Sequence, residues 1–290
     1  MKLLAFTLLL IGSAFAENAG IDFDNLVSME PEVPIMAHVR EAFVPGQSRI
    51  VGGSEASRHQ FPYQVGIFIN TADGTGFCGG SLLSDEWVLT AAHCAEPGNS
   101  FTVILAAHAI RENEDAQIQL TVTEKYVHPN YDSSRISNDV ALLKLPTKVQ
   151  LSDKVQTIRL PSRSQANQAF ENAAATVSGW GRDSDNSNAI SPILRFVQVP
   201  VITNTLCNLM FFGSIQSSNI CTSGTGGKGT CNGDSGGPLV VVDSDGQVTQ
   251  VGIVSFGIAL GCEVGWPAAY ARVTSYLDWI SSTSGIAIRN

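Results

Sequence analysis

The chain has 290 residues, of which 44% are hydrophobic and 15% charged, and its formal net charge is −9. An acidic chain without a basic cluster has no electrostatic basis for binding nucleic acid, so we expect no such partner. Six cysteines are typical of an exported protein with three disulfides, and their spacing alone leaves the pairing open. Neither Cys-x-x-Cys nor His-x-x-x-His occurs, so we expect no zinc site.

Residues 1–16 have the features of a secretory signal peptide. Lys2 precedes a run rich in Leu, Phe and Ile, and Ala14-Phe15-Ala16 ends it with a small-x-small cleavage pattern. The alternative, a membrane anchor, needs a longer apolar run, and here the polar Glu17 and Asn18 follow. We therefore expect a secreted, extracellular protein without a membrane partner.

Residues 17–49 differ in composition from the rest of the chain. They contain six acids, two bases and three prolines, but no cysteine and little periodicity. This composition is typical of a segment without stable structure.

Short β-rich runs alternate with polar turns from Phe61 onward. In the first half we expect strands at 63–69, 80–83, 87–90, 101–105, 118–127 and 140–145, with a turn at 70–76. In the second half we expect strands at 174–179, 194–201, 238–242, 248–256 and 269–273. This regular spacing predicts an all-β barrel or sandwich. The best helical pattern follows a cap at Thr274 or Ser275 and ends before Gly285.

Ser235 lies in a glycine-rich loop, Gly229-Thr230-Cys231-Asn232-Gly233-Asp234-Ser235-Gly236-Gly237-Pro238, and is the candidate nucleophile. The glycines allow the backbone to approach a reacting carbonyl, and the amides of Gly233 and Ser235 are free to form an oxyanion hole. A serine hydroxyl is too weak to attack an amide alone, so the chain must also supply a base and a group that orients it.

The candidate base is His93 in Thr90-Ala91-Ala92-His93-Cys94, and the candidate orienting acid is Asp139 in Asn138-Asp139-Val140. With the Ser235 loop, these motifs resemble the chymotrypsin family of serine endopeptidases, in that family's order His, Asp, Ser. The resemblance runs from Ile50 to about Ser282, and arthropod digestive proteases of the brachyurin type have similar segments. It implies catalysis by these three side chains without a cofactor.

The resemblance also implies the architecture. We expect an all-β protein of two six-stranded antiparallel barrels, with the active site in the cleft between them, a barrel boundary near 161–171 and a C-terminal α-helix. The family pattern pairs the cysteines as Cys78–Cys94, Cys207–Cys221 and Cys231–Cys262.

Arg49-Ile50-Val51-Gly52-Gly53 resembles the family's zymogen activation site. Residues 17–49 would then be an activation pro-segment and 50–290 the protease domain. Cleavage after Arg49 would give Ile50 a free ammonium group, which pairs with the carboxylate of Asp234, because a buried carboxylate needs a counter-charge. Without a cysteine, the cleaved pro-segment is expected to be released.

The resemblance places the primary specificity pocket at Gly229, Ser255, Gly257 and Ala268. Gly229 stands where trypsin-like members carry Asp, so an arginine or lysine side chain would be buried without a partner. We expect cleavage after large apolar or aromatic residues. An elastase-like preference and a broad brachyurin- or collagenase-like specificity remain alternatives, because Ala268 takes some depth and Glu263 lies in the adjoining segment.

A pocket that rejects arginine cannot efficiently cut the chain after Arg49. We therefore expect an activating trypsin-like protease among the partners, beside protein or peptide substrates and candidate protein inhibitors.

Three further alternatives concern metal and role. The loop 107–117 offers Glu112, Glu114 and Asp115 for calcium, but Ala107 stands at a ligand position, so a solvated acidic loop is favoured and no metal is expected. A non-catalytic binding homologue would normally have lost a catalytic residue, and a cascade protease would normally carry cysteine-rich modules. A monomeric digestive protease is the preferred interpretation.

Overall fold

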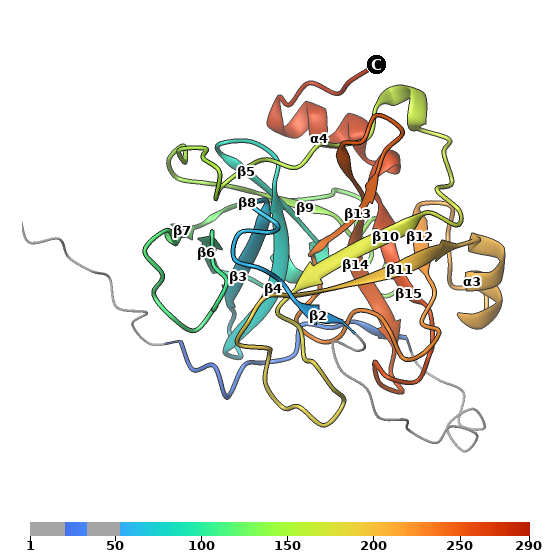
Figure 1. Ribbon diagram of the computed structural model, residues 1–290, viewed down its shortest axis with the longest axis horizontal. Coiled ribbons are helices and arrows are strands. Elements are labelled where there is room, and N and C mark those ends of the chain that lie inside the picture. The colour runs from blue at the N-terminus through green and yellow to red at the C-terminus, as the bar shows by residue number, and fades with distance from the viewer. Residues whose placement is uncertain (1–20, 34–52) are drawn as a thin grey trace, which may run out of the picture.

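The computed structural model describes residues 21–33 and 53–290, whose strands form two largely antiparallel sheets packed against each other (Figure 1). The first sheet has the order β7-β6-β3-β4-β5-β9-β8. Its strands are β3 (Gln64–Asn70), β4 (Thr75–Leu82), β5 (Trp87–Thr90), β6 (Ser100–Leu105), β7 (Ile118–Val122), β8 (Glu124–Val127) and β9 (Ala141–Lys144).

The second sheet closes into a six-stranded ring because β14 pairs with both β13 and β15. Its strands are β10 (Ala174–Gly179), β11 (Arg195–Ile202), β12 (Asn219–Thr222), β13 (Pro238–Val242), β14 (Val248–Ile258) and β15 (Ala268–Arg272). The short β2 (Ser54–Glu55) is added to β11, and β1 (Glu32–Val33) pairs in parallel with β14. The predicted two-barrel class is confirmed; the first sheet differs in having seven strands and no closing pair among the described residues.

The strands form where the sequence alternates. In β11, Val197, Val199 and Val201 are buried while the residues between them are exposed, which is the period of two that a half-buried strand requires. By contrast, β3 is buried at six of its seven positions because both of its faces are covered. One core cluster contains residues from both sheets, such as Val65 and Ile253, so the two barrels share apolar packing.

Buried polar pairs also join the two sheets. The Ser178 hydroxyl donates to Oε1 of Gln64 (2.6 Å), and the Ser81 hydroxyl donates to Oε1 of Gln250 (2.7 Å). Because a buried polar group is costly unless it is hydrogen-bonded, these pairs fix one alignment of the barrels.

The helices are short: α2 (Ala92–Ala95), α3 (Asn204–Met210) and α4 (Leu277–Ser284). The C-terminal helix is present, but its predicted caps are wrong. Thr274 and Ser275 lie in the 3-10 turn Val273–Ser275, and α4 begins two residues after them and ends at Gly285 in the left-handed region (φ 75°). None of the helices in the described ranges has the length and apolar character needed to cross a membrane.

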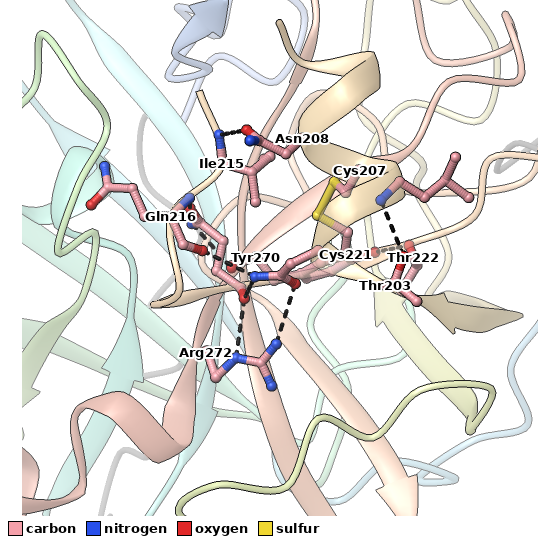
Figure 2. The surroundings of a disulfide bond; sticks show 12 residues. Thr203, Cys207, Asn208, Ile215, Gln216, Cys221, Thr222, Tyr270 and Arg272 are labelled. Atoms are coloured by element: carbon pink, nitrogen blue, oxygen red, sulfur yellow. Dashed lines mark hydrogen bonds between the residues drawn. A yellow bond between two sulfur atoms is a disulfide. The ribbon is translucent and has the colours of Figure 1, made fainter. Parts of the chain in front are cut away.

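A disulfide holds α3 against the second barrel (Figure 2). Thr203 caps the helix by accepting a hydrogen bond from the Leu206 amide (3.1 Å), and Cys207 in the helix is bonded to Cys221 in β12. The Asn208 side chain accepts a hydrogen bond from the Ile215 amide (2.8 Å) and so fixes the turn after the helix. These contacts explain how a seven-residue helix persists.

Candidate active site

His93 and Asp139 come together at the inner edge of the first barrel. His93 lies on α2, directly after β5, and Asp139 lies two residues before β9. Nδ1 of His93 is 2.8 Å from Oδ2 of Asp139, and the His93 amide donates to Oδ1 (2.9 Å). Asn138 adopts a left-handed conformation (φ 54°), which asparagine tolerates, and the chain thereby turns Asp139 into the interior.

A third donor reaches Asp139 from the second barrel. The Ser255 hydroxyl on β14 donates to Oδ2 of Asp139 (2.5 Å). Both Asp139 and Ser255 are buried. The carboxylate therefore has three hydrogen-bond donors, enough to hold it ionised inside the protein.

The pKa values of the pair reflect this arrangement. Burial raises the pKa of Asp139. The His93 charge and the hydrogen bonds from His93 and Ser255 outweigh burial, so the pKa lies below its usual value. Burial lowers the pKa of His93, whereas the Asp139 charge and hydrogen bond, together with the charge of Glu30, raise it overall. This is the pattern of an imidazole prepared to accept a proton.

Ser235 lies in a tight loop on the second barrel. Its carbonyl accepts a hydrogen bond from the Gly79 amide of β4 (2.7 Å), and the neighbouring Gly236 amide donates to Val254 (2.8 Å). Gly236 has a φ of 79°, and a Cβ there would lie 2.1 Å from Oγ1 of Thr90, so only glycine fits. The Ser235 hydroxyl is buried and has no hydrogen-bond partner among the described residues.

Asp234 is buried directly before Ser235. Its carboxylate accepts hydrogen bonds from the amides of Gly181 (2.8 Å) and Cys231 (2.9 Å). Burial outweighs these bonds and raises the pKa of Asp234 to about 7, and the Glu30 charge adds to this increase. The predicted activation residues, Arg49 and Ile50, and the predicted signal peptide lie outside the described residues.

Three of the four predicted specificity residues line one cavity. Gly229, Gly257 and Ala268 contribute to it, with an apolar wall of Ile258, Leu260 and Trp266. A Cβ placed on Gly229 or Gly257 would meet nothing within 4 Å, so the cavity is open at both positions. Ser255 is not among the lining residues and instead contacts Asp139.

Two acids line this cavity, Glu30 and Asp185, and Asp185 has partners at its rim. Asp185 accepts hydrogen bonds from the amides of Cys262 (2.7 Å) and Glu263 (3.1 Å), and Glu263 in turn accepts one from the Asp185 amide (3.0 Å). These reciprocal bonds hold the loop that carries the Cys231–Cys262 disulfide.

The three disulfides are Cys78–Cys94, Cys207–Cys221 and Cys231–Cys262, the pairs that the resemblance implies. The first joins β4 to α2 next to His93. The third joins the Ser235 loop to the rim of the cavity.

The acidic loop 107–117 is closed by protein donors. The Glu114 carboxylate accepts hydrogen bonds from the amides of His108 and Ala109 (3.1 Å for Ala109) and contacts Arg58. Burial raises the pKa of Glu114, but these donors outweigh burial and lower it. Neither Glu112 nor Asp115 belongs to a cluster of possible metal ligands among the described residues.

Residues 21–33 lie against the protease body, so the expectation of a segment without stable structure is wrong for this part. Oε1 of Glu30 accepts a hydrogen bond from the Gly233 amide (3.1 Å), and β1 pairs with Gly257 and Ile258 of β14. Glu30 is partly exposed as a residue, but its carboxyl group lies inside the cleft. No motif in the sequence marks this residue.

A histidine–aspartate pair on one barrel and a glycine-flanked serine on the other form the arrangement of a serine protease. The family profile described as Trypsin matches residues 50–280. Brachyurin from Leptuca pugilator is 46% identical over 237 residues, 82% of this chain and 99% of that protein. Chymotrypsin from Phaedon cochleariae is 33% identical over 287 residues, 98% of each chain.

A solved structure is similar to this chain in both fold and sequence. HL collagenase is 40% identical, has a TM-score of 0.75, and is matched over 82% of this chain and 99% of its own. The chain therefore belongs to the trypsin family. Like the relatives named as proteases, it is a serine protease, and its substrates are proteins.

Proposed function

We propose that this protein is a secreted serine endopeptidase made as a zymogen, with Ser235 as nucleophile, His93 as general base and Asp139 as the group that orients the base. The observation that carries the proposal is the 2.8 Å contact between Nδ1 of His93 and Oδ2 of Asp139, because it leaves Nε2 to accept a proton.

In this mechanism Ser235 Oγ attacks the carbonyl carbon of the scissile bond while Nε2 of His93 takes the hydroxyl proton. The carbonyl oxygen becomes an oxyanion held by the amides of Gly233 and Ser235. The carbon–nitrogen bond then breaks, and His93 gives its proton to the departing amine. Water, deprotonated by His93, attacks the acyl-enzyme, and Ser235 leaves with the proton returned to it.

Specificity for large apolar or aromatic side chains is the proposal that the cavity supports best. Its base is open at Gly229 and its wall is apolar, while Asp185 already accepts hydrogen bonds from backbone amides. Gly229 places no carboxylate at the base, so an arginine charge buried at that position would lack the partner that an aspartate there would give it. An elastase-like or broader preference, as the relatives named brachyurin and collagenase suggest, is the second candidate.

Zymogen control follows from Asp234. Burial raises the pKa of this carboxyl group to about 7, and no cation among the described residues offsets the effect. The ammonium group created by cleavage between Arg49 and Ile50 would supply that positive charge. We further propose that residues 1–16 are removed on secretion, that 17–49 form the pro-segment, and that 50–290 form a monomeric protease with a barrel boundary near 161–171.

The test is to express residues 17–290, treat the protein with trypsin, and compare cleavage of matched peptides with Phe, Leu, Ala or Arg before the scissile bond. We expect turnover of Phe or Leu only after trypsin treatment, and none by Ser235→Ala. Preference for Ala would favour the elastase-like alternative, and cleavage after Arg would overturn the assignment of the pocket. A folded, processed chain without activity would revive a binding role.

A further inference from the structure

The described part of the pro-segment contacts both barrels through apolar side chains. Ile21, Phe23 and Leu26 pack against a buried cluster that includes Phe68 and Trp180. The rings of Phe23 and Phe68 meet edge to face with centroids 5.3 Å apart. The segment therefore buries apolar surface instead of only passing over the protein.

Arg111 fixes the same part of the segment. Its guanidinium lies 5.3 Å from the ring centroid of Phe23 and forms an ion pair with Asp24 (3.2 Å). Further along, the Val27 amide donates to the Thr75 carbonyl (2.9 Å), which adds a backbone contact at the start of β4.

Glu30 then enters the catalytic centre. Its carboxylate accepts the hydrogen bond of the Gly233 amide, one of the two proposed oxyanion donors. Burial in the cleft raises the pKa of Glu30, and the charge of His93, the Ser235 side chain and the Gly233 amide oppose this rise. The backbone of Glu32 and Val33 pairs with β14 beside the specificity cavity.

The group at the oxyanion donors is a side-chain carboxylate and not a peptide carbonyl. A carboxylate carbon is a poor electrophile and carries no amine leaving group, so attack by Ser235 would break no peptide bond. The segment therefore fills the position of a reacting carbonyl without being cut there.

We propose that residues 21–33 are a built-in inhibitory ligand of the active-site cleft, which blocks the zymogen and still binds the enzyme after cleavage at Arg49. This inference rests on the proposed catalytic function. The contacts described are non-covalent and lie upstream of the activation bond, so cleavage removes the covalent connection but none of these contacts. Release then depends on dilution of the fragment, in contrast to the spontaneous loss expected from the sequence.

The chain itself provides a direct experiment. Residues 21–33 contain neither lysine nor arginine, so trypsin can cut after Arg40 and Arg49 but leaves them intact. We would activate residues 17–290 with trypsin, block the trypsin, and measure activity before and after gel filtration. We expect specific activity to rise when the fragment is removed and to fall when it is returned. Equal activity in all three samples overturns the proposal.

A synthetic peptide of residues 21–33 then tests the contact of Glu30. We expect competitive inhibition of the filtered enzyme, and a loss of about tenfold in affinity for Glu30→Gln, because the Gly233 amide then donates to a neutral amide oxygen in place of a carboxylate. Asp22→Asn is the matched control: it removes the same charge, but the side chain of Asp22 accepts only local hydrogen bonds, from Asp24 and Asn25, among the described residues. Similar losses for both variants overturn the role of Glu30.

Binding to Ser235→Ala, measured by fluorescence anisotropy, separates this inference from the catalytic proposal. If the processed enzyme is inactive but the peptide binds, the catalytic proposal fails and the inference that residues 21–33 are a ligand of the cleft stands. If the enzyme is active and the peptide does not bind, the inference fails alone. Mass spectrometry completes the test, since rapid cleavage of the peptide within residues 21–33 would make it a substrate and overturn the proposal.

Discussion

Replacing Asp234 by asparagine in the uncleaved chain should change how the stability of the protein depends on pH. The folded carboxyl group has a pKa of about 7, against 3.8 for the unfolded group. The folded state therefore holds a proton between these values that the unfolded state has lost. Stability from this group is complete below pH 3.8 and is lost as pH rises through 7.

The magnitude follows from the difference between the two pKa values. About three pH units at about 1.4 kcal/mol per unit give a loss of ~4 kcal/mol between pH 4 and pH 8. In Asp234→Asn this contribution is absent. The variant also loses one of the two hydrogen bonds to the Gly181 and Cys231 amides, since asparagine offers a single acceptor oxygen, at a pH-independent cost of about 1–2 kcal/mol.

The assay is urea unfolding of the uncleaved chain at several pH values, in a Ser235→Ala background that prevents self-digestion. We expect the free energy of unfolding of the parent minus that of Asp234→Asn to fall by up to ~4 kcal/mol from pH 4 to pH 8. Asp153→Asn, an exposed acid, is the charge-matched control. A difference that stays constant with pH would refute the reasoning, and cleavage by trypsin should abolish the trend by adding the Ile50 ammonium group.

Three other predictions concern the site and its surroundings. Ser255→Ala should lower kcat/KM about tenfold, because it removes a hydrogen bond to the ionised Asp139, while circular dichroism stays unchanged; an unaltered rate would contradict the positioning role. Gly229→Asp should allow cleavage after Arg and make purified zymogen activate itself, measured by the appearance of the processed chain; continued rejection of Arg would show that position 229 does not face the substrate side chain. Chelation by EDTA should leave the thermal midpoint unchanged, because Glu114 is already held by two amides and Arg58; a calcium-dependent rise would reveal a site there.

The sequence predicted most strands because their apolar runs are long enough to recognise. It missed β12, which has only four residues, all buried, and therefore lacks alternation. It also missed α3, whose stability depends on the Thr203 cap and the Cys207–Cys221 disulfide more than on periodicity. The predicted turn at 70–76 ends too late, because Thr75 and Gly76 already pair with β3.

The candidate active site could be predicted from the sequence where motifs mark its residues. His93, Asp139 and Ser235 stand in recognisable surroundings, and the structure brings the first two within 2.8 Å. Glu30 was not accessible, since a single glutamate in an acidic segment has no pattern and its partner Gly233 lies 203 residues away. Long-range contacts of this kind depend on the folded arrangement and not on local composition.

The hydrogen bonds between the barrels make catalytic activity depend on how the two barrels are aligned. The proposed nucleophile belongs to one barrel and its proposed base to the other. Hydrogen bonds between Gly79 and Ser235 and between Ser81 and Gln250 join the two barrels. A reacting geometry is sensitive to displacements of about 1 Å, far less than unfolding requires. Heat, denaturant or mutation that loosens this junction should therefore abolish activity while each barrel is still folded. Activity should then be lost before the circular dichroism spectrum changes.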